Sequence, residues 1–199
     1  MERVLNSEAA SDRELVAQLQ GGAETAFDEL VLRHQQRAIN VAFQLLRDHE
    51  DAREVAQDAF VKVYRNIGEF RGECEFTTWL HQIVVNLARN MHRWWHRRGK
   101  ETTVSLDCPA ETVDGEVTRQ VAGGAEAPDA AAAKAEFVES ISATMALLPA
   151  KFREVLVLRN VENLSYEEIA VAVGCSVGTV KSRIARARDQ MRVAMAGEL

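Results

Sequence analysis

Apolar positions in the N-terminal half of the chain recur at helical spacing. The pattern starts at Asp12, is interrupted at Gly21 and Gly22, and resumes over residues 23–46. A second stretch, residues 51–67, has small and aromatic apolar side chains on one face and charged side chains on the other. The apolar stripe of this stretch consists of Ala52, Val55, Ala56, Ala59, Phe60, Val63 and Tyr64. The spacing therefore predicts amphipathic helices, each with one face that packs into a core.

A loop and a long helix are expected next. Glycines break the pattern within residues 68–75, and Thr77 or Thr78 can cap a helix that extends to about Arg98. This helix has an apolar stripe and a separate polar face. The stripe consists of Leu80, Val84, Leu87, Met91 and Trp94, and the polar face consists of Asn86, Asn90, Arg93 and Arg97.

Residues 99–129 change character. They are acidic, contain scattered glycine and proline, and show no sustained period, which is typical of a flexible linker. A helical pattern returns over residues 130–148, and Pro149 fits the first position of another helix. The expected fold is all-α, with two small helical domains joined by a flexible acidic linker. The domains are residues 1–99 and 133–199, and the linker is residues 100–132.

The C-terminal segment has the spacing of a helix-turn-helix. Ser165 and Glu168 form a capping box, residues 174–176 make a tight turn, and a last helix covers residues 177–195. Apolar side chains are expected to pack between the two helices, namely Ile169, Ala170 and Val173 against Val177, Val180 and Ile184. The alternative is an ordinary helical hairpin with a solvated basic face. The coincidence of a cap, a small-residue turn and a basic second helix favours binding in a DNA major groove.

Charge is unevenly distributed along the 199 residues, whose net charge is −6. Arg89–Lys100 contains five basic residues and no acid, and Val177–Arg192 contains five basic residues against one acid. Glu101–Lys134 contains seven acids against two bases. Two basic islands in an otherwise acidic chain suit local contact with phosphates and limit non-specific binding elsewhere. The low aromatic content, 6%, weakens an all-β interpretation.

Chemistry other than binding finds little support. Cys74, Cys108 and Cys175 are far apart, so reduced cysteines in a cytosolic protein are favoured over a disulfide or zinc site. The sequence contains no P-loop, nucleophile elbow or metalloprotease motif, and no signal-peptide core or membrane-length apolar run. We therefore expect a cytoplasmic, non-enzymatic protein without cofactor, metal or small-molecule substrate.

The helix expected over residues 77–98 interleaves basic residues with tryptophan, histidine and asparagine. Such a mixture suits melted DNA, because cations contact phosphates, aromatic rings stack on bases and amides bind base edges. Taken singly, these residues have plainer explanations. Trp79 favours a core anchor, and Trp94 and Trp95 are adjacent, so one should be buried and the other partly exposed. His81, His92 and His96 lack companions for a metal site.

These signals, in this order, resemble the extracytoplasmic-function (ECF) sigma factors of bacterial RNA polymerase, within the sigma-70 superfamily. The matching segments are DAREVAQDAFVKVYRNI (51–67), FRGECEFTTWLHQIVVNLARN (70–90), and LPAKFREVLVLR with LSYEEIA and CSVGTVKSRIARAR (148–188). The resemblance implies a transcription initiation subunit that directs polymerase to specific promoters, helps to melt the DNA and serves a stress response.

The resemblance also implies roles for individual residues. Contacts to core polymerase would fall on Asp51, Glu54, Val55, Gln57, Asp58 and Phe60. Contacts to the −10 element would fall on Phe70, Arg71, Gly72, Phe76, Trp79, Asn86, Arg89, Asn90, Arg93, Arg97 and Arg98. Contacts to the −35 element would fall on Ser176, Thr179, Lys181, Ser182, Arg183 and Arg186. In this scheme the loop over residues 70–76 captures a flipped base, which offsets the cost of unstacking it.

The implied partners are core RNA polymerase, through its largest-subunit clamp and its flap, promoter DNA, and an anti-sigma factor. The acidic strip over residues 101–134 is a candidate mimic of nucleic acid inside the polymerase. Free protein is expected to bind promoter DNA poorly, because its net charge is negative and the two domains that would recognise the −10 and −35 elements are joined flexibly. One rival is a stand-alone helix-turn-helix regulator, which leaves the 77–98 helix unexplained. Another is an adaptor or anti-sigma-like protein that acts only through protein contacts.

Overall fold

The computed structural model describes residues 10–98 and 140–197, and in this part of the chain every regular element is a helix. The N-terminal bundle, residues 10–98, contains α1 (Asp12–Gln20), α2 (Glu24–Leu46), α3 (His49–Asn66), the short 3-10 helix η1 (Ile67–Glu69) and α4 (Phe76–Arg98). The C-terminal bundle, residues 140–197, contains a helical segment over residues 140–147, α6 (Ala150–Asn160), α7 (Tyr166–Val173) and α8 (Val177–Met195). The all-α expectation is confirmed, while the predicted linker, residues 100–132, lies outside the described residues.

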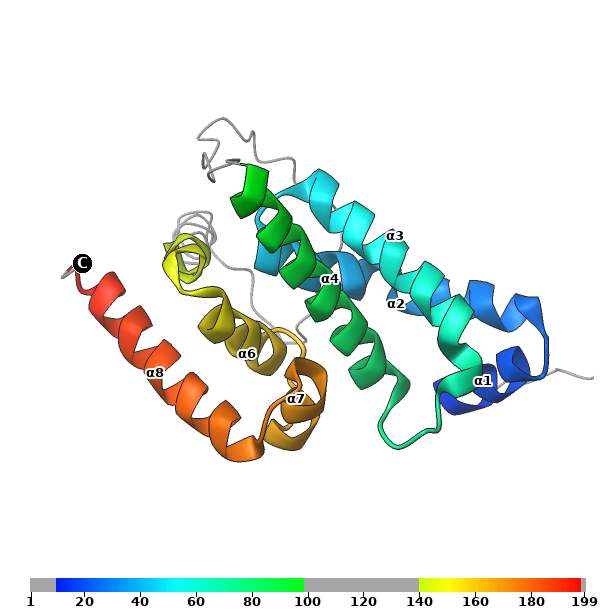
Figure 1. The fold of residues 1–199 in the computed structure, drawn as a ribbon. Coiled ribbons are helices and arrows are strands. Elements are labelled where there is room, and N and C mark those ends of the chain that lie inside the picture. Colours follow the sequence, from blue (N-terminus) through cyan, green and yellow to red (C-terminus); the bar gives the residue numbers. More distant parts are fainter. Residues whose placement is uncertain (1–9, 99–139, 198–199) are drawn as a thin grey trace, which may run out of the picture.

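The long helices α2, α3 and α4 pack together in the N-terminal bundle, and α1 lies against α2 and η1 (Figure 1). Buried aliphatic side chains from the three long helices fill the space between them: Leu30, Val41, Val55, Val63, Leu80 and Val84. Burying one such side chain contributes about 1.5–3 kcal/mol relative to leaving it in water. The apolar faces thus fix the rotation of α4, which leaves its polar face outside.

Local hydrogen bonds set where helices begin. Ser11 and Glu14 form a capping box at the start of α1, and the Asp48 side chain accepts hydrogen bonds from two backbone N–H groups of α3. Such a cap satisfies donors that have no partner within the helix and stabilises it by about 1 kcal/mol. The cap at Asp48 starts α3 at His49, slightly before the residue 51 that the apolar pattern predicts.

Two helix starts differ slightly from the sequence prediction. The N–H of Trp79 donates a hydrogen bond to the carbonyl oxygen of Glu75 at 3.1 Å. This is the first backbone hydrogen bond of α4, so the helix begins at Phe76. Thr77 and Thr78 therefore lie inside its first turn and do not cap it. Pro149 occupies the N-cap position of α6, one residue before the first helical position at which it was expected.

The α7–α8 pair forms the predicted helix-turn-helix. The Ser165 hydroxyl accepts a hydrogen bond from the N–H of Glu168 at 3.2 Å, and the Glu168 carboxylate accepts one from the N–H of Ser165 at 2.7 Å. Gly174 ends α7 with a φ of 69°. Residues with a Cβ adopt this left-handed backbone conformation only at a cost in free energy, which favours glycine here. The predicted apolar contacts are buried at Ile169, Ala170, Val173, Val180 and Ile184, and half-buried at Val177.

The two bundles pack against each other. Helix α4 lies against α7 and α2 lies against α6, whereas α8 lies on the outer side of the C-terminal bundle (Figure 1). Within residues 10–98 and 140–197 we find no helix that is long and apolar enough to cross a membrane. The same residues bring together no group of three or more histidine, cysteine or carboxylate side chains that could hold a metal ion.

Candidate nucleic-acid interface

The connection between η1 and α4 presents a loop that aromatic side chains anchor. Phe76 is buried, and the ring of Phe70 lies against that of Trp79 with the centroids 4.8 Å apart. Arg71 and Gly72 are exposed, and Gly72 has a φ of 70°, which favours glycine at the tip. The predicted −10 residues of this segment thus divide into three that form the base of the loop and two that reach solvent.

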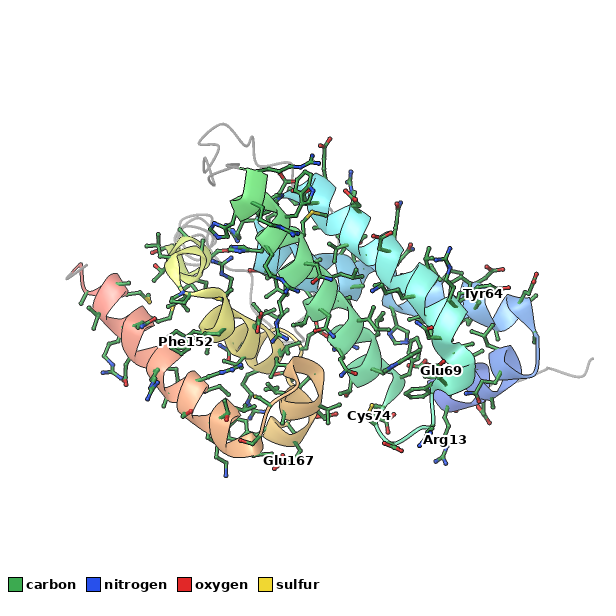
Figure 2. The ribbon with its side chains drawn as sticks, viewed as in Figure 1. Arg13, Tyr64, Glu69, Cys74, Phe152 and Glu167 are labelled. Carbon is green, nitrogen blue, oxygen red and sulfur yellow. The ribbon has the colours of Figure 1, made fainter. Side chains whose placement is uncertain are left out.

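Cys74 lies in the same loop (Figure 2) and carries a free thiol. Burial, together with the carboxylates of Glu75 and Glu73, raises the pKa of this thiol. The protonated form is therefore favoured, and a protonated thiol is a poor nucleophile. Cys175 is also free and half-buried, while Cys108 lies outside the described residues.

Gln20 holds the backbone that leads into this loop, a role that the sequence analysis did not predict. Its Nε2 atom donates hydrogen bonds to the carbonyl oxygens of Ile67 and Phe70, both at 2.8 Å. One amide at the end of α1 thereby fixes the backbone at the first residue of η1 and directly after its last residue. A glutamine at a helix end gives no signal of such a role in the sequence alone.

The family resemblance implies that this loop contacts promoter DNA. Replacing Gln20 by alanine is therefore expected to reduce promoter transcription by about fivefold, because two hydrogen bonds of about 0.5–1.5 kcal/mol each no longer hold the loop backbone. Run-off transcription by reconstituted polymerase would measure the loss. The matched control is Gln18→Ala, since Gln18 is an exposed amide on the same helix. Equal transcription by the two variants would contradict a positioning role for Gln20.

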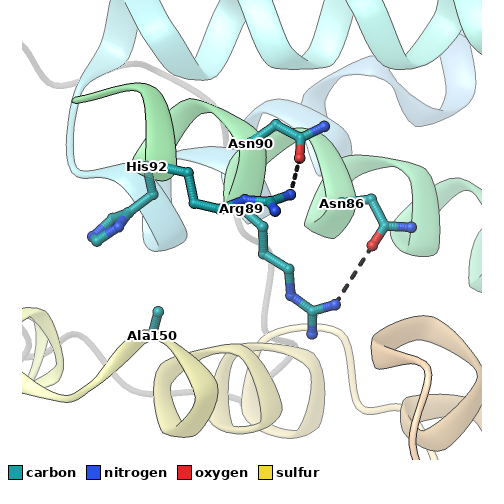
Figure 3. A pocket seen from close by; sticks show the side chains of 6 residues that line it. Asn86, Arg89, Asn90, His92 and Ala150 are labelled. Carbon is teal, nitrogen blue, oxygen red and sulfur yellow. Dashed lines mark hydrogen bonds between the residues drawn. The ribbon is translucent and has the colours of Figure 1, made fainter. Parts of the chain in front are cut away.

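Amide and guanidinium groups line the outer face of α4. Asn86, Asn90 and Arg93 are exposed; Asn90 accepts a hydrogen bond from Arg93, and Asn86 accepts one from Arg89 at 3.5 Å (Figure 3). A cavity of about 600 Å³ opens beside these side chains, and Ala150 of α6 lines it from the C-terminal bundle. The face therefore offers donors and acceptors of the kind that bind base edges and phosphates.

The C-terminal end of α4 carries the tryptophan pair. Trp95 is buried at 6% exposure and Trp94 is 38% exposed, as expected for adjacent residues. The apolar stripe thus ends on Trp95, four residues after Met91, and the prediction that placed Trp94 in the stripe is wrong. The guanidinium of Arg98 lies 4.4 Å from the ring centroid of Trp94, and Arg97 is exposed. This end of α4 thus presents an aromatic ring and two cations to solvent.

Arg89 alone among the predicted −10 residues bonds to oxygens of the C-terminal bundle in the described chain. Its Nε and Nη2 atoms donate to the two carboxylate oxygens of Glu154 at 2.7 and 2.6 Å. Its Nη1 and Nη2 atoms both lie 3.2 Å from the carbonyl oxygen of Val173. The guanidinium is therefore held by two helices of the other bundle.

Other polar groups also join the bundles. The carboxylate of Glu162, nearly fully buried, accepts a hydrogen bond from Arg37 at 3.0 Å and lies 3.3 Å from Nε2 of His81. Burial opposes ionisation of this carboxyl group, but hydrogen bonds and charges from His81 and Arg37 outweigh it and lower the pKa of Glu162. Arg153, also buried, donates to the carbonyl oxygen of Leu45 at 2.7 Å. An ionic cluster at Glu162 and the hydrogen bond from Arg153 to a backbone carbonyl therefore fix how the bundles meet.

The second helix of the helix-turn-helix directs its basic face outward. Ser176, Lys181, Ser182 and Arg186 are exposed, while Thr179 and Arg183 are half-buried. Ser176 caps α8 by accepting a hydrogen bond from the N–H of Thr179 at 3.2 Å, and Ser182 donates to the Thr179 carbonyl at 2.9 Å. The hydroxyl groups of Ser176, Thr179 and Ser182 thus form hydrogen bonds within the helix. The long cationic side chains Lys181, Arg183 and Arg186 are then the ones that can extend into a DNA groove.

The predicted polymerase-binding residues of α3 do not all reach the surface. Glu54, Gln57 and Asp58 are exposed and Asp51 is half-buried, but Val55 and Phe60 lie in the core at 2% and 7% exposure. In this structure those two residues hold the helix in place and offer no surface to a partner. The apolar period already placed both on the inner stripe.

Tyr64 departs from the predicted apolar stripe of α3. It is 46% exposed, and its ring lies at the surface against Phe27 with the centroids 5.1 Å apart (Figure 2). The ring of Tyr64 therefore belongs to the surface of α3 and not to its buried stripe.

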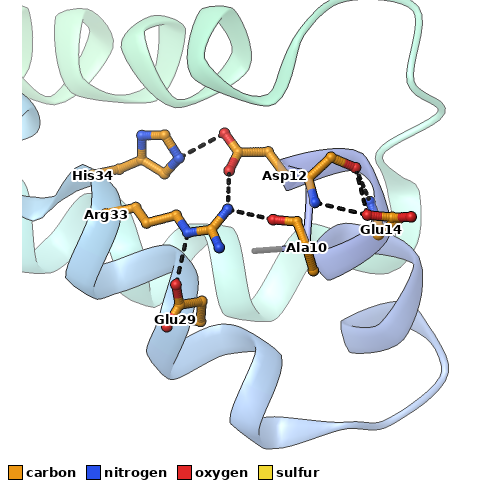
Figure 4. Close-up of polar contacts among 7 residues, drawn as sticks. Ala10, Asp12, Glu14, Glu29, Arg33 and His34 are labelled. Atoms are coloured by element: carbon orange, nitrogen blue, oxygen red, sulfur yellow. Dashed lines mark hydrogen bonds and ion pairs between the residues drawn. The ribbon is translucent and has the colours of Figure 1, made fainter. Parts of the chain in front are cut away.

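A separate polar cluster holds α1 on α2 (Figure 4). Arg33 donates to the Ala10 carbonyl at 2.5 Å and to Glu29 at 2.7 Å, and His34 lies 2.7 Å from Asp12. Burial lowers the pKa of His34, although Asp12 opposes the shift. Because these groups already have partners within the bundle, we assign the cluster a structural role.

Comparison with known proteins identifies both bundles. Residues 30–98 match the family described as Sigma-70 region 2, and residues 139–191 match Sigma-70, region 4. The RNA polymerase sigma-H factor of Pseudomonas aeruginosa is 38% identical over 184 residues, which cover 92% of this chain and 93% of the relative. The ECF RNA polymerase sigma-E factor of Escherichia coli strain K12 is 34% identical over 183 residues, with coverage of 92% and 93%.

Solved structures resemble the arrangement as a whole. CnrH, in complex with the cytosolic domain of CnrY, superposes with a TM-score of 0.66 at 26% identity, covering 94% of this chain and 99% of CnrH. The sigma factor RpoE of Bartonella quintana, in complex with the anti-sigma factor NepR, shares the fold at a TM-score of 0.59 and 24% identity, with coverage of 85% and 96%.

Proposed function

This chain belongs to the sigma-70 family as an ECF sigma factor, the subunit that directs RNA polymerase to promoters, and we propose that its two bundles divide promoter recognition between them. Residues 1–99 would act as domain two, which binds core polymerase and the melted −10 element. Residues 133–199 would act as domain four, which reads the −35 element as duplex. The observation that carries this proposal is the outer face of α4, which presents amides and arginines next to the exposed loop between η1 and α4.

Each reader suits its form of DNA. The cations of α8, Lys181, Arg183 and Arg186, project from one helix, and a helix fits the major groove of duplex DNA. The face of α4 combines Asn86 and Asn90 with an exposed Trp94, a combination suited to separated strands whose base edges and ring faces are accessible. The polymerase carries out nucleotidyl transfer, so this subunit contributes binding, and we place its action in the cytoplasm.

We propose polymerase and anti-sigma contacts as well. Asp51, Glu54, Gln57 and Asp58 form a polar patch on α3 that suits docking to the polymerase clamp, and domain four would meet the flap. CnrH is solved with the cytosolic domain of CnrY. By that likeness, we propose that a protein partner, an anti-sigma factor, binds this chain as well.

Run-off transcription with purified core polymerase and a promoter library tests the assignment. Wild-type chain should select a subset of promoters, and Asn86→Ala with Asn90→Ala should lower their transcripts about thirtyfold, because each base-edge contact contributes about 1 kcal/mol or more. The control is Gln35→Ala with Gln36→Ala, two exposed amides on α2. Failure of the wild-type chain to bind core polymerase would overturn the docking assignment, and full activity of the asparagine variant would overturn the −10 assignment.

A further inference from the structure

Glu154 offers Arg89 the same chemistry that a DNA phosphate offers. A carboxylate that accepts two parallel N–H bonds from a guanidinium uses the fork geometry by which arginine also binds phosphate. Glu154 is only 4% exposed, so its charge is directed at Arg89 and not at water. The Val173 carbonyl ends α7, and the negative end of that helix dipole adds to the attraction.

The same guanidinium cannot hold both partners at once. Its Nε and Nη2 atoms point at Glu154 at 2.7 and 2.6 Å, and Nη1 and Nη2 share the Val173 carbonyl. We propose that Glu154 competes with the melted −10 strand for Arg89, so that the packed bundles form a closed state in which the −10 reader is blocked. This proposal rests on the function assigned above, because it requires Arg89 to contact promoter DNA.

Further contacts across the same interface stabilise the closed state. Glu162 is buried against Arg37 and His81, and Arg153 reaches the carbonyl oxygen of Leu45. These groups make opening a concerted separation of the bundles. A change in the rotamer of Arg89 alone would not open the −10 face, because Ala150 of α6 also lines the cavity beside that face.

Closure treats the two readers differently. Helix α8 lies on the side of the C-terminal bundle away from α4, and Lys181, Ser182 and Arg186 remain exposed (Figure 1). The closed chain therefore blocks single-strand binding and leaves duplex binding unchanged. Domain separation, which polymerase can drive by binding both bundles, then makes the −10 reader available.

Glu154→Gln in the full-length chain tests the competition. Fluorescence anisotropy would follow a labelled single strand carrying the −10 sequence of a promoter selected in the run-off experiment. We expect the variant to bind this strand about tenfold more tightly than wild type, because a larger fraction of molecules is open. Affinity for a −35 duplex should stay the same, and small-angle X-ray scattering should show a larger radius of gyration.

Two further variants make the result specific. Glu167→Gln makes the same change in charge at an exposed position of α7 and should leave strand affinity within about twofold of wild type. The double exchange Arg89→Glu with Glu154→Arg should restore the compact shape without restoring strand binding. Unchanged strand affinity in Glu154→Gln, or an equal gain in Glu167→Gln, would overturn the competition.

Polymerase assays separate this inference from the function on which it rests. Holoenzyme with Arg89→Ala should assemble normally and lose promoter transcription, whereas holoenzyme with Glu154→Gln should transcribe like wild type. Normal transcription by Arg89→Ala would refute the −10 role of Arg89 and the competition with it. A loss with Arg89→Ala, together with unchanged strand affinity in Glu154→Gln, would refute the competition alone.

Discussion

Replacing both Arg183 and Arg186 by alanine is expected to reduce transcription from promoters with a −35 element by about a hundredfold. Each arginine that binds a guanine edge or a phosphate in the major groove contributes about 1–3 kcal/mol. On α8, Arg186 is exposed and Arg183 is half-buried. Run-off transcription with saturating core polymerase would measure the change. Binding to core polymerase should persist, because the proposed docking patch lies on α3.

Arg188→Ala with Arg192→Ala is the matched control for that experiment. Both arginines are exposed on the same helix, and the pair removes the same charge. Arg192 pairs with Asp189 at 2.7 Å, but an exposed pair of this kind contributes at most about 1 kcal/mol. An equal loss in the two double variants would assign the effect to general charge and contradict readout by Arg183 and Arg186.

Features encoded by neighbouring residues could be predicted from the sequence. The capping box of Ser165 and Glu168 and the left-handed turn at Gly174 follow from local backbone chemistry, and both occur in the structure. Helical geometry predicted in the same way that one of the adjacent Trp94 and Trp95 is buried, although the apolar stripe named Trp94 and the structure buries Trp95. These elements were accessible because the groups involved lie within a few residues of each other.

Contacts between distant residues could not be predicted in this way. Arg89 and Glu154 are 65 positions apart, and the sequence offers many acids as possible partners. The same holds for Gln20, whose two acceptors are backbone carbonyls that leave no mark in a side-chain pattern. Tertiary packing decides these contacts, and it also brings together two domains that the sequence suggested were only flexibly joined.

Val55 and Phe60 show how family resemblance and physical pattern can disagree. The resemblance placed them among polymerase contacts, whereas the helical period placed them on the apolar stripe of α3. The structure buries both side chains, so the period describes their surroundings better. The four polar residues Asp51, Glu54, Gln57 and Asp58 therefore carry the prediction for docking.

Leu80→Ala is expected to lower the free energy of unfolding of the N-terminal bundle by about 3 kcal/mol, because it removes buried methyl groups and leaves a cavity. Leu80 is 1% exposed on α4, the helix that carries the −10 face. Urea denaturation followed by tryptophan fluorescence suits the measurement. The three tryptophans of the chain, Trp79, Trp94 and Trp95, all lie on α4, so the signal reports this bundle.

Leu32→Ala provides the matched control, since Leu32 is 67% exposed on α2 and its loss should cost no more than about 0.5 kcal/mol. The difference between two identical substitutions isolates burial from helix propensity. If Leu80→Ala cost less than about 1 kcal/mol, the packing that rotates α4 would be weaker than the structure indicates. Its exposed amides and arginines would then lack the rigid support that base readout requires, since a destabilised α4 would hold both faces less firmly.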